Sequence, residues 1–182
     1  MSLKRWIGVV GALALAGCLT SDGPLFDAEN ARALAFADGD YEACQVDDGV
    51  VGDCNDVNIT HDASGLYTFV MAIEDEKPSF ARFKAVGADK WAAQLWGMDD
   101  DDPFYFLASK ASDETSLSMI DCEGLPESFK KKYVARGKLE VREETTCVAK
   151  SASAVVAATK AWAKTDAART GDRVAYKKKA AG

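Results

Sequence analysis

The fold is decided by residues 66–120, which read LYTFVMAIEDEKPSFARFKAVGADKWAAQLWGMDDDDPFYFLASKASDETSLSMI. Large apolar residues alternate with other residues in five runs of this stretch, as Tyr67, Phe69 and Met71 do in the first run. Such alternation places the apolar side chains on one face of a β-strand. The runs begin at 66, 80, 91, 104 and 115, with short connections rich in charge and turn formers. These connections leave no room for crossover helices, so we expect antiparallel hairpins.

The chain before this stretch adds further strands. Residues 40–46 and 57–61 are two weaker candidates, which brings the expected total to about six or seven strands in up-and-down order. No internal repeat is evident in the sequence. The expected sheet is therefore an antiparallel meander, which can also curl into a barrel.

The pattern becomes helical after Cys122. Pro126 stands where a helix favours its first residue, which predicts a short helix over 127–133. After a short strand near 145–148, Ser151 or Ser153 can cap a helix that runs to about Arg169. Apolar residues share one side of this helix, which is typical of packing against a sheet; they are Val155, Ala158 and Trp162. The expected fold class is α+β, with the C-terminal helix packed on the meander.

The N-terminus has the pattern of an export signal. Lys4 and Arg5 supply positive charge, and residues 6–14 (WIGVVGALA) form a short apolar segment. This segment is shorter than the roughly 20 residues that span a bilayer as a helix. The tetrad Leu15-Ala16-Gly17-Cys18 follows directly, and it resembles the lipobox of bacterial lipoproteins.

The lipobox resemblance implies that residues 1–17 are a signal peptide, removed by cleavage before Cys18. It also implies a diacylglyceryl group on the Cys18 sulfur and, usually, an acyl chain on its amino group. Two or more chains anchor a protein firmly, at ~0.8 kcal/mol per buried methylene. Leu19 follows the cysteine where an Asp would imply retention at the inner membrane. We therefore expect a lipid-anchored protein of the bacterial cell envelope, at the outer membrane and facing the periplasm, with the lipid bilayer as its partner through acylated Cys18.

Four further cysteines, Cys44, Cys54, Cys122 and Cys147, form an even set in an exported chain. An even number predicts two disulfides, with free buried thiols as the alternative. Loop closure favours the local pairs Cys44–Cys54 and Cys122–Cys147, each adding about 2–4 kcal/mol of stability. No C-x-x-C pair is present, so the spacing does not favour a zinc site.

Beyond the signal peptide, the sequence suggests three parts. Residues 18–37 show weak periodicity and are expected to form the lipidated N-terminus and a tether. Residues 38–169 are expected to form a single periplasmic β-rich domain with its C-terminal helix. Residues 170–182 are expected to form a basic flexible tail.

Charge is distributed unevenly along the chain. The whole sequence carries a formal net charge of −7, whereas residues 18–125 hold 6 basic and 23 acidic side chains, a net of −17. Residues 126–182 hold 14 basic and 6 acidic side chains, a net of +8. An acidic chain of this kind is a poor binder of nucleic acid, which is therefore not an expected partner. The basic third can attract the acidic block within the fold, or it can contact an envelope protein or an anionic envelope polymer.

Residues with catalytic or ligand-binding chemistry are few. His61 is the only histidine, and no G-x-S-x-G segment is present, so we expect His61 to be a strand-end or loop residue. The acidic groups at 47–56 and 99–102 read as solvated turn carboxylates, with weak divalent-cation binding as the alternative. No glycine-rich phosphate loop follows a strand. We therefore expect no enzymatic activity, no cofactor and no resident metal.

Two functions agree with these features. The first is a membrane-anchored envelope lipoprotein with a non-catalytic binding or structural role. The second is a carrier of a small apolar ligand, because a meander followed by a helix is similar to the order of elements in lipocalins. The lipocalin Gly-x-Trp is replaced here by Gly39-Asp40-Tyr41. The two functions differ in whether five residues fill the barrel or leave a cavity; these are Tyr67, Phe69, Phe83, Phe104 and Phe106.

Overall fold

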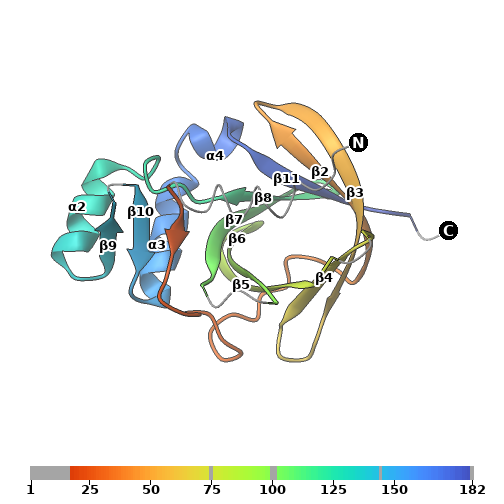
Figure 1. Ribbon diagram of the computed structural model, residues 1–182, viewed down its shortest axis with the longest axis horizontal. Helices are drawn as coiled ribbons and strands as arrows, with labels where there is room; N and C mark the ends of the chain where they lie inside the picture. Colours follow the sequence, from red (N-terminus) through yellow and green to blue (C-terminus); the bar gives the residue numbers. More distant parts are fainter. Residues whose placement is uncertain (1–16, 74–75, 99–101, 144, 181–182) are drawn as a thin grey trace.

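The alternating segments form a closed antiparallel barrel in the computed structural model (Figure 1), which describes residues 17–73, 76–98, 102–143 and 145–180. Neighbouring strands pair in the order β6-β5-β4-β3-β2-β11-β8-β7, and β6 also pairs with β7, which closes the barrel. The barrel strands are β2 (Gly39–Asp47), β3 (Val50–His61), β4 (Tyr67–Met71), β5 (Ser79–Gly87), β6 (Lys90–Gly97), β7 (Phe104–Ala111), β8 (Glu114–Met119) and β11 (Arg173–Lys178). The antiparallel meander is confirmed, and the barrel contains more strands than the expected six or seven.

The strand β11 corrects the expectation of a flexible basic tail. It pairs with β2 from Arg173↔Val46 to Lys178↔Tyr41 and with β8 from Val174↔Leu117 to Lys177↔Glu114. Val174 and Tyr176 pack toward the apolar core of the barrel, while the basic residues before and after them, Arg173, Lys177 and Lys178, conceal the strand pattern in the sequence. The segment is therefore an integral wall of the barrel.

The segment expected to be a tether is also part of the fold. Leu19, Phe26 and Phe36 are buried, and β1 (Leu19–Thr20) joins the sheet. Between β1 and β2 the chain follows the outside of the barrel, where the Leu25 and Phe26 N–H groups donate to the Gln94 side-chain oxygen at 2.8 Å. In Figure 1 this red-to-orange segment runs from β1 on the left, below the barrel, to the right-hand side, where β2 begins.

A small second layer lies beside the barrel. Its strands continue from β7 in the order β1-β10-β9, and the helix α3 packs against β5, β6, β7 and β10. Ser151 caps α3 by accepting a hydrogen bond from the Ala154 N–H, as the sequence predicts, although the helix ends at Trp162 rather than near Arg169. The elements of this layer are α2 (Glu127–Ala135), β9 (Leu139–Arg142), β10 (Thr146–Ala149), α3 (Ala152–Trp162) and α4 (Ala167–Thr170).

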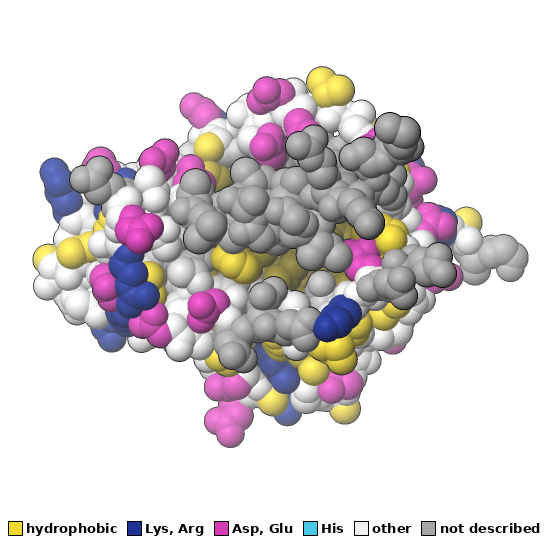
Figure 2. All heavy atoms as spheres, viewed as in Figure 1, with side chains coloured by type: hydrophobic (Ala, Val, Ile, Leu, Met, Phe, Trp, Pro, Cys, Tyr) yellow, Lys and Arg dark blue, Asp and Glu magenta, His cyan; other side chains and the backbone are white. Residues whose placement is uncertain are grey.

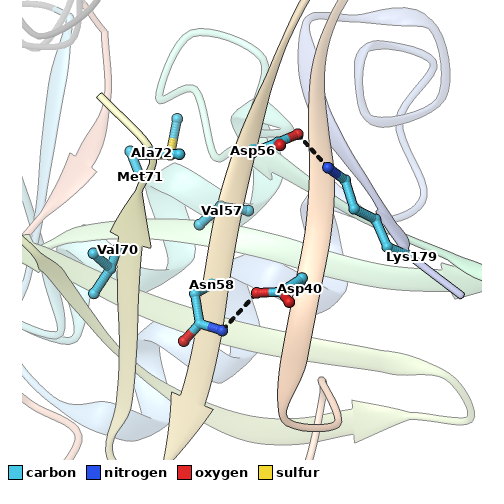
Figure 3. A pocket seen from close by; sticks show the side chains of 8 residues that line it. All are labelled: Asp40, Asp56, Val57, Asn58, Val70, Met71, Ala72 and Lys179. Atoms are coloured by element: carbon cyan, nitrogen blue, oxygen red, sulfur yellow. Dashed lines mark hydrogen bonds and ion pairs between the residues drawn. The ribbon is translucent and has the colours of Figure 1, made fainter. Parts of the chain in front are cut away.

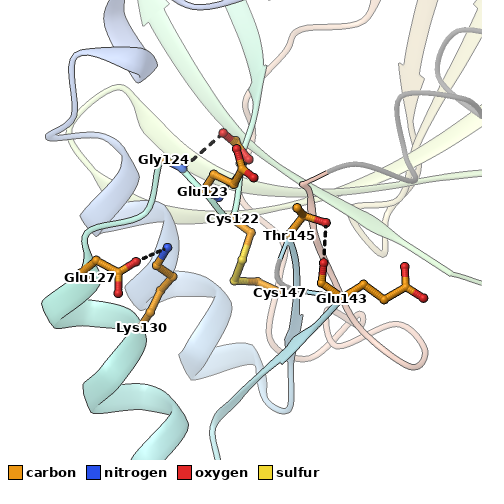
Figure 4. Close-up of a disulfide and its surroundings, with 9 residues drawn as sticks. Cys122, Glu123, Gly124, Glu127, Lys130, Glu143, Thr145 and Cys147 are labelled. Carbon is orange, nitrogen blue, oxygen red and sulfur yellow. Dashed lines mark hydrogen bonds and ion pairs between the residues drawn. A yellow bond between two sulfur atoms is a disulfide. The ribbon is translucent and has the colours of Figure 1, made fainter.

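Both predicted cysteine pairs are joined. Cys44–Cys54 links facing residues of β2 and β3 near their hairpin turn. Cys122 lies in the segment directly after β8, and its disulfide with Cys147 joins this segment to β10 (Figure 4). The hairpin turn itself places Asp48 and Gly49 at positive φ, the conformation that an Asp-Gly pair adopts most readily between two strands. Among the described residues, no helix has the length and apolar character needed to cross a membrane.

A network of ion pairs joins Asp22, in the segment after β1, to residues of β9 and to Lys150, which directly follows β10. Arg142 contacts Asp22 and Glu140 at 2.8 Å, and Lys150 contacts the same two carboxylates at 2.8 and 2.7 Å. Hydrogen bonds from Arg142 and then from Lys150 lower the pKa of Asp22 to about 2 and that of Glu140 to about 2. The network therefore restrains Asp22, four residues after the predicted lipidation site.

We expect this network to lose its stabilising effect in acid. The pKa values of Asp22 and Glu140 are lower in the folded state than in the unfolded state, where they are about 4. The network therefore contributes its full free energy of stabilisation above pH values of about 4, and this contribution is lost as the pH falls toward 2. Carboxyl NMR titration should place Asp22 and Glu140 near pH 2, and Arg142→Met should raise both values. Arg136→Met, at the end of α2, is the matched control. Normal titration of both carboxyls in the unsubstituted protein would contradict the network.

Candidate ligand-binding site in the barrel

One end of the barrel is filled by a single aromatic side chain. Phe36, which precedes β2, lies among five aromatic rings at centroid distances between 5.4 and 6.3 Å; they belong to Tyr41, Tyr67, Phe69, Phe83 and Tyr176. The Tyr67 hydroxyl donates to the Phe36 carbonyl at 3.0 Å, and the Tyr41 hydroxyl donates to the Ala37 carbonyl at 2.7 Å. We call this the closed end of the barrel. Here β2 begins and β7 finishes.

The opposite end, where β7 begins and β8 finishes, is less completely packed. We call it the open end. Leu95, Phe106 and Val174 belong to the apolar interior cluster, yet each is only partly buried. Figure 2, viewed as in Figure 1, shows hydrophobic side chains in a recess over the middle of the barrel. The inward-facing apolar residues at this end therefore keep accessible surface, which those at the closed end do not.

The hydroxyl of Tyr176 adds a polar group to this interior. Its ring packs against Phe36 and Phe69 at centroid distances of 5.4 and 6.0 Å. Burial raises the pKa of Tyr176 well above its ordinary value, although part of the residue keeps accessible surface. Within the described ranges, no hydrogen bond satisfies this hydroxyl, in contrast to those of Tyr41 and Tyr67. A hydroxyl that lies among apolar side chains and keeps accessible surface is suited to hydrogen-bond a bound molecule.

The five aromatic residues considered from the sequence divide between the two ends. Tyr67, Phe69 and Phe83 are 5 % exposed or less and fill the closed end together with Phe36. Phe104 and Phe106 stand near the start of β7 at the open end, and both are partly buried. The sequence therefore identified part of the lining. It missed Phe36 and Tyr176, because both lie in segments expected to lack regular structure.

The predicted lipidation residue lies beside the open end. Thr20 pairs with Phe104, the first residue of β7, and the Leu19 N–H donates to the Ile120 carbonyl, directly after β8, at 2.9 Å. Cys18 precedes them, forms a bridge with Asp121, and takes part in neither disulfide. It is 1 % exposed in the full-length chain, and burial, assisted by the nearby Asp121 charge, raises the pKa of its thiol. Most of the predicted signal peptide, with Leu15 and Ala16, falls outside the described residues.

His61 occupies the end of β3, as expected. Its Nδ1 lies 2.6 Å from an oxygen of Asp38, and its ring stacks on Tyr67 at 5.2 Å. The hydrogen bond to His61 is the main cause of a lowered pKa at Asp38. Its sequence neighbour Asp62 instead accepts hydrogen bonds from Ser64 and the Leu66 N–H. This pairing braces the closed end.

The acidic groups singled out in the sequence do not form one cluster of ligands. Asp56 pairs with Lys179 at 2.6 Å, and Asp47 binds the Gln45 amide. The group at 99–102 falls, except for Asp102, outside the described residues. In the part of the chain that the structure describes, the one grouping with metal-ligand spacing is Glu42 with Cys44 and Cys54, whose sulfurs are joined in a disulfide. A disulfide lacks the thiolate that metals prefer.

Two shallow hollows lie on the outer surface. The first, of about 340 Å³, crosses β3 and β4 between the ion pair Asp56–Lys179 and the hydrogen bond from Asn58 to Asp40 (Figure 3). The second, of about 530 Å³, lies between α2 and α3, with Phe129 stacked on Tyr133 at 4.3 Å. Basic residues of the last third of the chain border the second hollow; they are Lys132, Lys160 and Lys164.

No protein-family model, curated protein or solved structure matches this chain.

Proposed function

We propose that this protein is a lipid-anchored, non-catalytic binding protein of the bacterial envelope whose barrel takes up a small apolar molecule. The observation that carries the proposal is the asymmetry of the barrel interior. Phe36 fills the closed end, whereas inward apolar residues at the open end keep accessible surface. Apolar lining with a few polar groups is the usual character of a small-molecule site.

The arrangement of strands and helix supports the comparison with lipocalins. Eight antiparallel strands enclose the interior and α3 packs outside them. Seven of these strands, β2 to β8, precede α3 in the chain, in agreement with the meander-then-helix order expected from the sequence. The chain departs from that order in one respect, because the barrel is closed by β11 after the helix. The likeness is one of architecture, so the ligand is inferred from the interior itself.

The envelope location is supported by the lipobox and by the two disulfides, which form in oxidising compartments. Because Cys18 is 1 % exposed in the full-length chain, modification of its sulfur would have to precede the packing of β1. After cleavage, the acylated side chain would turn outward, while the hydrogen bond from Leu19 to Ile120 keeps the attachment point at the barrel. An envelope protein or an anionic envelope polymer is a further proposed partner, with the lysine-bordered hollow between α2 and α3 as its contact surface.

Native mass spectrometry of the protein, extracted gently from its own envelope, tests the proposal. The expected spectrum contains the acyl mass on Cys18, the mass loss of two disulfides, and a non-covalent adduct that is released on activation. A neutral fluorescent probe such as N-phenyl-1-naphthylamine should compete with that adduct and bind one site saturably. An acylated protein without an adduct, and without saturable probe binding, would contradict the carrier function and leave the anchor.

A substitution in the lining should weaken this binding. Leu95→Gln places an amide among apolar residues of the open end, which costs roughly 1–3 kcal/mol when the amide finds no partner. Probe affinity should therefore fall by about tenfold or more. Val70→Gln is the matched control, because Val70 is 45 % exposed on the outer face of β4. Equal affinities of the two variants, measured by probe titration on folded protein, would exclude the barrel interior as the site.

A further inference from the structure

The two ends of the barrel can be distinguished by the loops they carry. Neighbouring antiparallel strands place their connections alternately at opposite ends. The open end therefore carries the turn between β2 and β3, the connection between β6 and β7, and the chain that leaves β8. The closed end carries the segment before β2 with Phe36, together with the turns that end β5 and β7.

The attachment point for the lipid lies at the open end. Thr20 pairs with Phe104 and Leu19 bonds to Ile120, and these partners are the first residue of β7 and the residue after β8. Leu19 is fully buried, so no flexible spacer separates Cys18 from the barrel. An acyl chain on Cys18 can reach only a bilayer that lies close to this end.

Exposed apolar side chains lie at the same end. Val50 and Val51, at the tip of the β2–β3 hairpin, are 69 % and 63 % exposed, and Met98, directly after β6, is 59 % exposed. Such residues on loop tips can enter the interfacial region of a bilayer, where apolar area adds to the hold of a lipid anchor. The disulfide Cys44–Cys54 braces the hairpin that presents two of them.

We propose that the acylated Cys18 holds the open end of the barrel against the bilayer, so that the barrel exchanges its apolar ligand directly with the membrane. This inference rests on the proposed function, and it specifies the partner surface and the source of the ligand. A molecule that leaves the bilayer would enter the lining of Leu95, Phe106 and Val174 without crossing open water. The Tyr176 hydroxyl, which lies against the interior cluster and keeps accessible surface, would bind one polar atom of that molecule.

The ligand class follows from the charge of the interior. No charged side chain is buried in the described chain; the buried polar residues are Ser21, Gln94, Thr115, Ser118 and Thr159. A carboxylate or phosphate placed there would lack a compensating cation. The structure thus favours an uncharged, membrane-soluble molecule with one hydroxyl or carbonyl group.

Photo-crosslinking to lipid tests the orientation. The mature acylated protein is reconstituted into phosphatidylcholine vesicles that contain labelled acyl chains, and benzoylphenylalanine replaces one residue at a time. Zwitterionic lipid is chosen because acidic Asp48 and Glu123 lie at the open end and would be repelled by anionic lipid. Met98 and Val50 report on the open end, and Leu34, which is 64 % exposed before β2, reports on the closed end.

The expected result is a lipid adduct several-fold stronger at Met98 and Val50 than at Leu34. Equal labelling, or stronger labelling at Leu34, in protein that floats with the vesicles would overturn the orientation and leave the anchor standing. The Cys18→Ser variant should neither float nor form adducts at any position. If unsubstituted protein also fails to float and lacks the acyl mass, the failure lies in the proposed anchor, and the orientation falls with it.

Discussion

Deletion of residues 173–182 should leave a chain that does not fold cooperatively. The deletion removes β11, which pairs along its length with β2 and for four residues with β8. Both neighbours would become unpaired edges, and the interior would lose Val174 and Tyr176. A domain of ordinary stability, about 5–15 kcal/mol, has no reserve for the loss of a central strand. Urea unfolding followed by circular dichroism, with dye binding to exposed apolar surface, would measure the effect.

Deletion of residues 180–182 alone is the matched control. It shortens the same terminus but keeps β11 and Lys179, whose N–H donates to the Asp40 carbonyl and whose amine contacts Asp56. This variant should unfold like the full-length protein. If the variant without residues 173–182 unfolded cooperatively in urea with an unchanged midpoint, β11 would not be needed for the fold. That result would contradict its pairing with β2 and β8.

The second large effect is expected for Phe36→Ala. The substitution leaves a cavity among the five rings that contact Phe36 at the closed end. Loss of a buried phenylalanine side chain costs about 3–5 kcal/mol. The free energy of unfolding, measured in urea, should fall by this amount, and Phe36→Leu should lose less.

Leu34→Ala is the control for this prediction. Leu34 lies two residues away on the same segment but is 64 % exposed, so its truncation should change the free energy of unfolding by less than about 0.5 kcal/mol. If Phe36→Ala lowered the free energy of unfolding no more than Leu34→Ala does, the packing of Phe36 would not stabilise the closed end.

The meander could be predicted from the sequence because strand periodicity is a local signal. Tyr67 and Phe69 stand on either side of Thr68, Phe83 stands between Arg82 and Lys84, and short connections separate the strands. The disulfide pairs and the Ser151 cap were predictable for the same reason, since each depends on residues close in sequence.

The closure of the barrel could not be predicted in this way. In β11 the apolar residues Val174 and Tyr176 stand among basic residues, and this composition is typical of an exposed tail. Phe36 belongs to an irregular segment whose burial depends on the completed barrel around it. The lining of the interior includes residues of both segments, so the candidate site could be predicted only as a set of aromatic strand residues.

The position of β11 also has a consequence for the proposed export. Every other described strand precedes β11 in sequence, and it enters the sheet between β2 and β8. If the chain crosses a membrane starting from its N-terminus, β11 is the last barrel strand to reach the other side. In such a transit, β2 and β8 would lack the strand between them until residue 178 had passed, so the barrel would stay open. Folding and release into the receiving compartment would thus be coupled by topology, because long-range pairing of this kind has to wait for the whole chain.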